Sequence, residues 1–581
     1  MEQKYEAIII GSGFGGAITG CRLAKRWPGG KVLILERGKR YPMGSFARSP
    51  HDVSQAFWVR ADEKTPRPRR VRKIIEKTRH NAHGLFDIRN YHHMDAVIGA
   101  GLGGGSLIYA NVFMIPPEST FGTGWPSSCD RSALAPYYAV AREVLGSRPI
   151  PTGTGNPRRE VVRTMLFEKV AGRCGRESQL ADINVFFGND FAQPTPIGQQ
   201  ERNRYGALQT SCTYCAECIV GCNYHAKNTL DLNYLFAAEH RHGAVIRTEH
   251  LATRVVPLDA AGSDSPDATG EHGYRVYYRD LLSDAGAEQS ACCRRVVVSA
   301  GTFGSVELLL RSRDHFGTLP RIGSQLGQFF SGNGDFLSFV LGSRQCANPN
   351  YGPTITQRTD YNLFHNFDPD HAFILEDAAY PPFLAWFIEG AQPRFVAVQR
   401  AIAILRHWIA KWTSGKSLGS LGWVFADVLA NDISSRTCVL LCMGIDGSNG
   451  QMKLDENNEL AVDWPYEENM HLYRAVLKAG KRFARDVGTR WFTPLPSWYP
   501  PLRNNVTVHP LGGCVLADDD AHGVISADRR TFGQVFGYHG LFVADGSIVP
   551  RSVGANPTAT ISALSEMVAE GITGITPDAN L

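Results

Sequence analysis

The sequence lacks the features that would place it across a membrane or on nucleic acid. Nowhere do 18 apolar residues run consecutively, so no transmembrane helix is expected. The first residues have no basic region, long apolar core and small-residue cleavage site, so no signal peptide is expected. The net charge is only +4, which gives no bulk argument for a nucleic-acid partner. These absences favour a cytoplasmic protein, and they leave peripheral contact with a membrane open.

The positive charge is unevenly spread along the chain. Residues 60–80, "RADEKTPRPRRVRKIIEKTRH", carry nine Lys or Arg. Such a run is commonly a solvated loop, and the alternative is a surface that docks on anionic lipid or an acidic partner.

Length and composition indicate a folded protein of more than one domain. The chain has 581 residues, of which 43% are hydrophobic and 20% charged. A single hydrophobic core does not usually grow to this size, so about two or more domains are expected. No internal repeat or low-complexity linker appears, and residues 262–270 are expected to form an exposed hairpin tip or loop.

Residues 6–38 follow the order strand, glycine turn, helix, second strand. Gly11, Gly13 and Gly16 stand at G-x-G-x-x-G spacing, directly after an apolar run. In such a turn the glycines allow a tight bend, close approach to a pyrophosphate and close helix–strand packing. Glu36 ends the second strand and is suited to accept hydrogen bonds from a ribose hydroxyl. The stretch predicts dinucleotide binding but does not by itself distinguish NAD from FAD.

Three further stretches favour FAD. Residues 95–113 contain a second glycine-rich loop, residues 294–312 a strand, a turn at Gly301 and a helix. Residues 540–567 contain a strand ending in Asp545 and Gly546, then a helix starting near Pro557. A site assembled from both ends and the middle of a chain suits the longer, non-dissociating FAD better than NAD.

These stretches resemble the glucose–methanol–choline (GMC) family of flavin oxidoreductases, and more narrowly its cholesterol oxidase-like branch. "VHPLGGCVL" and "DGSIVPRSVGANPTATISAL" are similar to the two C-terminal signatures of that branch. The resemblance runs from the first strand to the last helix. The glycine turns and this resemblance together predict FAD contacts by Gly11, Gly13, Phe14, Gly16, Glu36, Gly101, Gly104, Gly105, Ser106, Asn111, Gly301, Asp545, Gly546 and Pro557.

Alcohol oxidation needs a base for the hydroxyl proton while a hydride leaves the same carbon. Histidine is suited to this task because its side chain titrates near neutral pH. His509 follows an apolar run and precedes a proline, so its ring is expected to be fixed at a strand end. Asn556 could hold the substrate oxygen as negative charge develops on it. By resemblance, these two positions match the catalytic histidine and asparagine of the family.

Glu376 is the third catalytic candidate, in the apolar stretch "FILEDAAYPPFLAWF". A carboxylate buried among these residues would have a raised pKa. In cholesterol oxidases a glutamate in a similar stretch moves a proton between ring carbons during steroid isomerisation. The alternative is an exposed Glu376–Asp377 pair at a turn.

Between residues 341 and 495 aromatic residues are dense, which favours a sterol or long-chain alcohol over a sugar as substrate. Within residues 394–412 apolar side chains recur at helical spacing, with Arg400, Arg406 and Lys411 on other faces. The alternatives are a helix packed on the core and an interfacial helix or lid that admits a lipophilic alcohol from a membrane.

Four of the 13 cysteines stand together in C-x2-C-x2-C-x3-C spacing: Cys212, Cys215, Cys218 and Cys222. Structural zinc usually takes two ligand pairs separated by a longer loop. The observed spacing is that of ferredoxin iron–sulfur ligands, apart from the following proline, which is Asn223 here. Certain GMC dehydrogenases carry a cysteine cluster in the corresponding insertion. The alternatives are therefore a [3Fe–4S] or [4Fe–4S] cluster, zinc, or free packed or redox-labile thiols.

The predicted fold is α/β, with a Rossmann-type FAD-binding domain assembled from residues 1–46, 205–340 and 500–581. The cysteines form an insertion in its second part. Residues 47–204 and 341–499 are expected to build a substrate domain with a mixed or antiparallel sheet and helices. The predicted activity is FAD-dependent oxidation of a lipophilic alcohol, with a 3β-hydroxysteroid first and a long-chain fatty alcohol as alternative. A protein, a quinone or O2 would accept the electrons, and a redox sensor or electron-transfer flavoprotein is the alternative outside this class.

Overall fold

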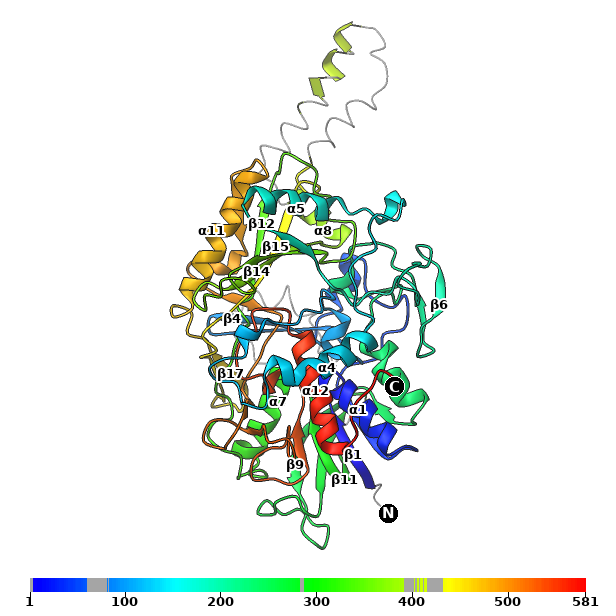
Figure 1. Cartoon of the computed structure of the whole chain (residues 1–581), viewed down its shortest axis with the longest axis vertical. Helices are drawn as coiled ribbons and strands as arrows, with labels where there is room; N and C mark the ends of the chain where they lie inside the picture. The colour runs from blue at the N-terminus through cyan, green and yellow to red at the C-terminus, as the bar shows by residue number, and fades with distance from the viewer. Residues whose placement is uncertain are drawn as a thin grey trace.

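The computed structural model describes residues 4–59, 81, 83–282, 287–390, 402, 405–406, 408–410, 412–414 and 432–581. Within these residues two large sheets lie in opposite halves of the molecule (Figure 1). The basic run at 60–80 lies outside the described residues, as does most of the predicted helix at 394–412. No helix among the described residues combines the length and apolar character needed to cross a membrane.

The first sheet has seven strands drawn from three distant stretches of the chain. Its parallel part runs β8(Val245–Arg247), β2(Val32–Leu35), β1(Lys4–Ile10), β11(Glu288–Val298) and β22(Leu541–Val543). β10(Tyr274–Asp280) and β9(His250–Pro257) extend it in antiparallel order. The long β11 pairs with β10 through its first half and with β22 through its last residues. Continuous burial of β2 and β22, and of β1 from Ala7 to Ile10, matches a parallel sheet covered on both faces.

Helices cover both faces of this sheet. α1(Phe14–Arg26) packs against α12(Thr558–Thr573) and α6(Tyr234–His240), and α12 also contacts α4(Arg131–Val144). α7(Gly301–Leu310) contacts β9. The buried Arg22 joins α1 to α12 through a two-pronged ion pair with Glu566 at 2.8 Å. The N-terminal and C-terminal parts of the chain therefore fold as one unit around β1.

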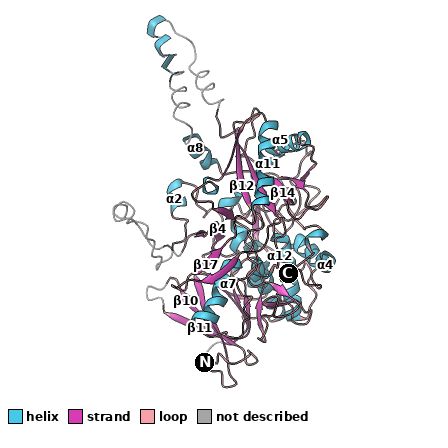
Figure 2. Cartoon of the chain, turned by 90° about the vertical axis from the view of Figure 1, so that its left-hand side faces the viewer, coloured by secondary structure: helices cyan, strands magenta, loops and turns pink. Residues whose placement is uncertain are grey.

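The second sheet is antiparallel throughout. Its order is β18(Trp491–Pro494), β12(Phe336–Leu341), β15(Cys438–Gly444), β14(Phe373–Ala378), β13(Gln357–Tyr361) and β5(Ser178–Leu180). α11(Met470–Asp486) and α5(Val162–Arg173) pack against it, and α8(Pro382–Gly390) follows β14 (Figure 2). The apolar side of α11 gives it a strongly amphipathic pattern, which suits a helix with one face on a sheet.

Between the two sheets lies a three-stranded one, β19(Asn505–Thr507), β4(Met94–Gly99) and β3(Phe86–Tyr91). The predicted fold class is confirmed: a doubly covered sheet assembled from discontinuous segments stands beside an antiparallel sheet with helices. The loop at 262–270 joins the antiparallel strands β9 and β10, as expected. The domain boundaries themselves remain a prediction.

Candidate active site

The first glycine turn joins β1 to α1. Gly11 has φ +96°, and a Cβ there would lie 2.2 Å from the carbonyl oxygen of Ser299. A Cβ on Gly16 would lie 2.0 Å from the carbonyl oxygen of Gly11. Gly13 differs, because a Cβ there would meet nothing within 4 Å. Gly11 and Gly16 thus serve the bend and the packing, and Gly13 borders open space at the start of α1.

The second glycine loop lies directly on the first. A Cβ on Gly104 would come within 2.8 Å of the Cα of Gly13, whereas one on Gly105 would meet nothing within 4 Å. Ser106 accepts a hydrogen bond from the backbone N–H of Leu230 and donates one to Gly103. Two loops separated by about 90 positions in the sequence therefore form one glycine-lined surface.

The third wall is built from α7 and the end of β22. Gly301 opens α7 with φ +75°, and it too leaves the space around its Cβ position empty. Asp545 accepts hydrogen bonds from Gly301 N (3.0 Å) and from Ser305 Oγ (2.5 Å), and from the backbone and hydroxyl of Ser547. A Cβ on Gly546 would be 2.8 Å from Thr302 Oγ1. Asp545 and Gly546 therefore fix this wall by packing.

Glu36 stands at the end of β2, beside the first glycine turn. Its carboxylate accepts hydrogen bonds from the N–H (3.0 Å) and hydroxyl (2.6 Å) of Ser12 and from the N–H of Gly38 (2.8 Å). Burial raises its pKa, and the hydrogen bonds from Ser12 and Gly38 oppose that rise. These three hydrogen bonds hold the side chain in place beside the first glycine turn, and its contact with a ribose hydroxyl remains a prediction.

Two buried asparagines near the second glycine loop have unsatisfied amides. Asn111 and Asn184 are fully buried, neither side-chain atom of Asn111 has a hydrogen-bond partner in the described structure, and Asn184 faces only the hydroxyl of Tyr109. Their backbones are joined, since Asn184 donates its N–H to the Asn111 carbonyl at 2.7 Å. Buried carboxamides without partners are costly, so a polar ligand is expected to meet them. Sequence analysis identified Asn111 but missed Asn184, which has no motif around it.

These observations fit FAD. The Cβ positions of Gly13, Gly105 and Gly301 face open space, and Gly13 stands at the N-terminus of α1, so this glycine-lined space is the proposed channel for FAD. Glu36 lies beside the first glycine turn, and Asn111 follows the second glycine loop. Pro557 is the N-cap of α12, directly after Asn556, so the last helix also begins at the site.

His509 is held by a carboxylate that sequence analysis did not find. Its Nδ1 lies 2.7 Å from Asp335 Oδ1, and the two side chains are only 15% and 2% exposed. Asp335 Oδ2 accepts hydrogen bonds from the N–H groups of Val508 and His509. A carboxylate can only accept, so Nδ1 carries the proton and Nε2 keeps a free lone pair.

The segment around Asp335 also holds the loop that carries Asn556. Asn333 donates a hydrogen bond to the carbonyl of Ala555 at 2.8 Å and accepts from the N–H groups of Val553 and Gly554. Asn333 (φ +55°) and Gly334 (φ +61°) are both left-handed, and Gly334 packs on the backbone of Gly444. A single tight turn therefore fixes both predicted catalytic residues.

Glu376 and Asn556 form a buried polar pair. Asn556 Nδ2 lies 3.4 Å from Glu376 Oε2, a long hydrogen bond, and Asn556 Oδ1 and Glu376 Oε1 have no partner in the described structure. Burial raises the pKa of Glu376 to about 8, with Asn556 opposing the rise. Glu376 is fully buried in β14, so the alternative of an exposed turn is wrong. The two free oxygens are suited to a polar substrate group.

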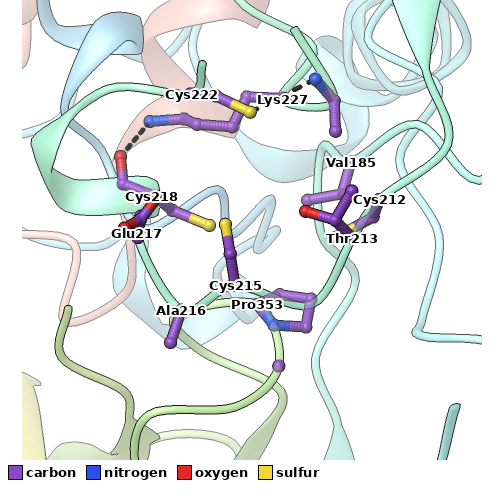
Figure 3. A pocket seen from close by; sticks show the side chains of 12 residues that line it. Val185, Cys212, Thr213, Cys215, Ala216, Glu217, Cys218, Cys222, Lys227 and Pro353 are labelled. Atoms are coloured by element: carbon purple, nitrogen blue, oxygen red, sulfur yellow. Dashed lines mark hydrogen bonds between the residues drawn. The ribbon is translucent and has the colours of Figure 1, made fainter. Parts of the chain in front are cut away.

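The four predicted cysteines line one small cavity together with Lys227, Glu217 and Pro353 (Figure 3). The sulfurs of Cys215 and Cys218 point toward each other across it. Arg48 holds the loop by bonding Glu217 (2.8 Å) and the carbonyls of Val220 and Gly221. Asn223, the residue that replaces the ferredoxin proline, exchanges two hydrogen bonds with the backbone of Phe46.

Backbone N–H groups are directed at the sulfurs. Ala226 donates to Cys222 Sγ at 3.2 Å and Tyr214 to Cys212 Sγ at 3.5 Å. Tyr214 (φ +62°) and Ala216 (φ +60°) take left-handed conformations that are uncommon for residues with a side chain. Such amide-lined concavities are typical of iron–sulfur and other anion sites.

Without a bound metal, burial keeps the thiols of the cavity protonated. Burial, followed by the other cysteines, raises the pKa of Cys212 well above its ordinary value and that of Cys215 to about 12. Within the described residues, no three His, Cys, Asp or Glu side chains lie close enough to hold one metal ion. In a multi-iron cluster each thiolate binds a different iron atom, so the sulfurs lie farther apart than around one metal ion. The absence of a single-ion site therefore does not test for a cluster. In residue type, common cavity and N–H···S donors, the four cysteines fit a cluster.

Comparison with known proteins agrees with this architecture. Two sequence models, both described as GMC oxidoreductase, match residues 197–328 and 446–565. Cholesterol oxidase of Acinetobacter baumannii is 26% identical over 97% of this chain and 93% of its own. Cholesterol oxidase of Mycobacterium tuberculosis is 28% identical over 98% of this chain and 91% of its own. Pyridoxine 4-oxidase from Mesorbium loti shares the fold, with a TM-score of 0.57, 15% identity, and coverage of 97% and 98%.

The matching GMC models and the nearly full-length similarity to cholesterol oxidases show a flavin-dependent oxidoreductase that acts on CH–OH donors. The chain belongs to the GMC oxidoreductase family and is cholesterol oxidase-like.

Proposed function

We propose that the protein oxidises a lipophilic alcohol, with His509 as the base that takes the hydroxyl proton. Bound FAD supplies the acceptor for the hydride that leaves the same carbon. The observation that carries this proposal is the hydrogen bond of 2.7 Å between His509 Nδ1 and Asp335. It leaves Nε2 as the acceptor and stabilises the imidazolium once the proton has moved.

Asn556 and Glu376 would orient the alcohol. Glu376 Oε1 is buried and lacks a partner, so the carboxyl group can hold the substrate oxygen while the single hydroxyl proton is left for His509. Asn556 Oδ1, on the same pair, also lacks a partner. With a pKa of about 8, Glu376 is mostly protonated at neutral pH and can donate a hydrogen bond from its carboxyl group. The same raised pKa suits the proton-moving role that the resemblance to cholesterol oxidases implies.

The substrate class is supported by the surroundings of this pair. One apolar cluster includes Ile374, Met443 and Ala555, which are the neighbours of Glu376 and Asn556 in sequence or contact. Two full-length relatives are named cholesterol oxidases. A 3β-hydroxysteroid is the leading substrate, and a long-chain fatty alcohol is the alternative.

An iron–sulfur cluster held by Cys212, Cys215, Cys218 and Cys222 would give the electrons an exit other than dioxygen. When bound, it would supply a one-electron relay to an external acceptor. The shared cavity and the N–H···S hydrogen bonds support this assignment over free thiols.

A lipophilic substrate also favours contact with a membrane surface. Leu405, Trp408 and Trp412 are 57%, 63% and 87% exposed, on short helical pieces far beyond α8 (Figures 1 and 2). Tryptophan and leucine exposed together suit the interfacial region of a bilayer.

Anaerobic addition of a 3β-hydroxysteroid tests the proposal. The wild-type enzyme should bleach the 450 nm band of its flavin, and His509→Ala should slow bleaching by about 10²- to 10⁴-fold while retaining FAD. Full-rate bleaching in that variant would remove His509 as the base. A flavin that no alcohol reduces would instead favour a redox sensor or an electron-transfer flavoprotein.

A further inference from the structure

Lys227 is a fully buried lysine whose side chain ends among backbone carbonyls. It is 1% exposed, and its Nζ donates hydrogen bonds to the carbonyl oxygens of Cys218 (2.8 Å), Tyr109 (2.9 Å) and Leu107 (3.1 Å). Among the described residues no carboxylate forms an ion pair within 4.0 Å of this ammonium, and the buried Asp231 acts on its charge only from farther away. Carbonyl dipoles satisfy its three protons but give it no anion in direct contact, which is costly in a buried place.

The three carbonyls belong to two different parts of the site. Leu107 and Tyr109 follow the second glycine loop, which lies on the first glycine turn and so borders the channel for FAD. Cys218 belongs to the cysteine loop, and Lys227 itself lines the cysteine cavity. Figure 3 shows the side chain running along that cavity to the carbonyl of Cys218. One ammonium therefore joins the two loops that carry the two redox sites.

The missing counter-ion matches what the cavity would contain. Thiolates that bind iron are anionic, and a cluster held by four of them carries net negative charge. A fixed positive charge beside such a cluster stabilises its reduced, more negative form and makes it a better electron acceptor.

We propose that Lys227 is a positioning residue that fixes the cysteine loop against the flavin-facing loop and raises the reduction potential of the cluster. This inference rests on the proposed cluster. Removal of the charge should shift the midpoint potential to more negative values. Loss of the clamp should lower iron affinity by about 10- to 100-fold, as changes to residues that support metal ligands commonly do.

The test compares Lys227→Met and Lys227→Gln, which remove the charge, with Lys227→Arg, which keeps it. Lys453→Met, at an exposed lysine of β16(Gln451–Leu454), is the matched control. Anaerobically purified proteins that retain FAD are assayed for iron and acid-labile sulfide. Their cluster midpoints are then measured by redox titration with electron paramagnetic resonance, and their iron affinity by competition with a chelator.

The expected result is a more negative midpoint and weaker iron binding in the Met and Gln variants. The Arg variant should keep a midpoint close to that of the wild type, and the Lys453→Met control should match it. If Met does not fold, Gln retains a donor for the carbonyls and gives the same comparison. If the uncharged variants hold the cluster with an unchanged midpoint potential, the proposed role of Lys227 is wrong and the cluster proposal stands. Wild-type protein without iron and sulfide would end the cluster proposal and this inference together.

Discussion

Asp335 accepts a hydrogen bond from Nδ1 of His509 at 2.7 Å, although 174 positions separate the two residues in the sequence. The same carboxylate accepts the N–H groups of Val508 and His509, so the backbone and the ring are fixed together. The geometry leaves Nε2 of the ring as the only nitrogen that can take a proton from a substrate.

Asp335→Asn should therefore slow flavin reduction although FAD stays bound. An amide in place of the carboxylate can donate to Nδ1, which would stabilise the opposite tautomer and remove the negative charge beside the imidazolium. The loss should lie within the roughly 10²- to 10⁴-fold contribution of a positioned base. Stopped-flow bleaching under anaerobic conditions measures it.

Asp519→Asn is the matched control for that variant. Asp519 also lies 2.7 Å from a histidine, His522, but both side chains are exposed and neither is a predicted site residue. This control should bleach at the wild-type rate. Equal rates in Asp335→Asn and wild type would contradict the proposed function of the pair.

Asn333→Ala should slow flavin reduction, because Asn333 holds the loop that carries Asn556. The substitution removes the bond to Ala555 and leaves the N–H groups of Val553 and Gly554 unsatisfied, next to Asn556. Each buried group left without a partner costs about 1–3 kcal/mol, so the melting temperature should also fall. Asn333→Asp keeps the acceptor for both N–H groups, so its rate of flavin reduction and its melting temperature should fall less. If Asn333→Ala has the wild-type melting temperature and rate of flavin reduction, Asn333 does not hold the Asn556 loop as proposed.

The parts of the site that sequence predicted are those with a local signal. The first glycine turn is recognisable because bend, pyrophosphate approach and helix packing all act within six residues, Gly11 to Gly16. The compact spacing of Cys212 to Cys222 is local in the same way. For the second sheet, only its class was predicted, as mixed or antiparallel. Its strand order could not be predicted, because it depends on pairings across the whole chain.

Asp335, Asn333 and Lys227 were missed because their roles exist only after folding. Asp335 stands in "SGNGDF", a stretch that by itself indicates only a turn. Its partner His509 follows β19, far along the chain. Lys227 gives no signal in the sequence, because its hydrogen-bond partners are backbone carbonyls, which every residue has. The adjacent Asn333 and Gly334 were the one available signal, since this pair favours left-handed backbone.

Stability should depend on pH through Glu376. The folded chain keeps the proton of this buried carboxyl up to a pKa of about 8, whereas the unfolded chain releases it near the ordinary value of 4.5. Between these values the folded state binds more protons, so stability is fully present below about pH 4.5 and is lost as pH rises toward 8. Glu376→Gln removes this proton and should flatten the profile.

Thermal unfolding of the FAD-bound proteins from pH 5 to pH 9 measures the effect. Glu456→Gln, at an exposed glutamate, should follow the wild-type profile. A Glu376→Gln profile as steep as that of the wild type would show that the carboxyl ionises in the folded protein at its ordinary pKa.

The cysteine cavity predicts a loss of iron on substitution of any one of its ligands. Cys215→Ser should reduce iron and acid-labile sulfide sharply, because a buried serine hydroxyl is a poorer ligand for iron than a thiolate. Cys346→Ser changes an exposed cysteine outside the cavity and should leave both unchanged. FAD content should stay the same in both variants. Equal iron in the two variants would mean that any iron lies elsewhere in the protein.

The exposed tryptophans predict binding to lipid. Trp408→Ser with Trp412→Ser should weaken co-sedimentation with vesicles of phosphatidylcholine and phosphatidylglycerol, because burial of each indole in the interface removes a large apolar surface from water. Trp491→Ser, at a tryptophan that is 52% exposed on β18, is the control and should bind like the wild type. Activity on a water-soluble alcohol should be equal in all three proteins, since the changed residues are exposed and are not among the predicted site residues. Vesicle binding that survives the double substitution would refute the contribution of these tryptophans to lipid contact.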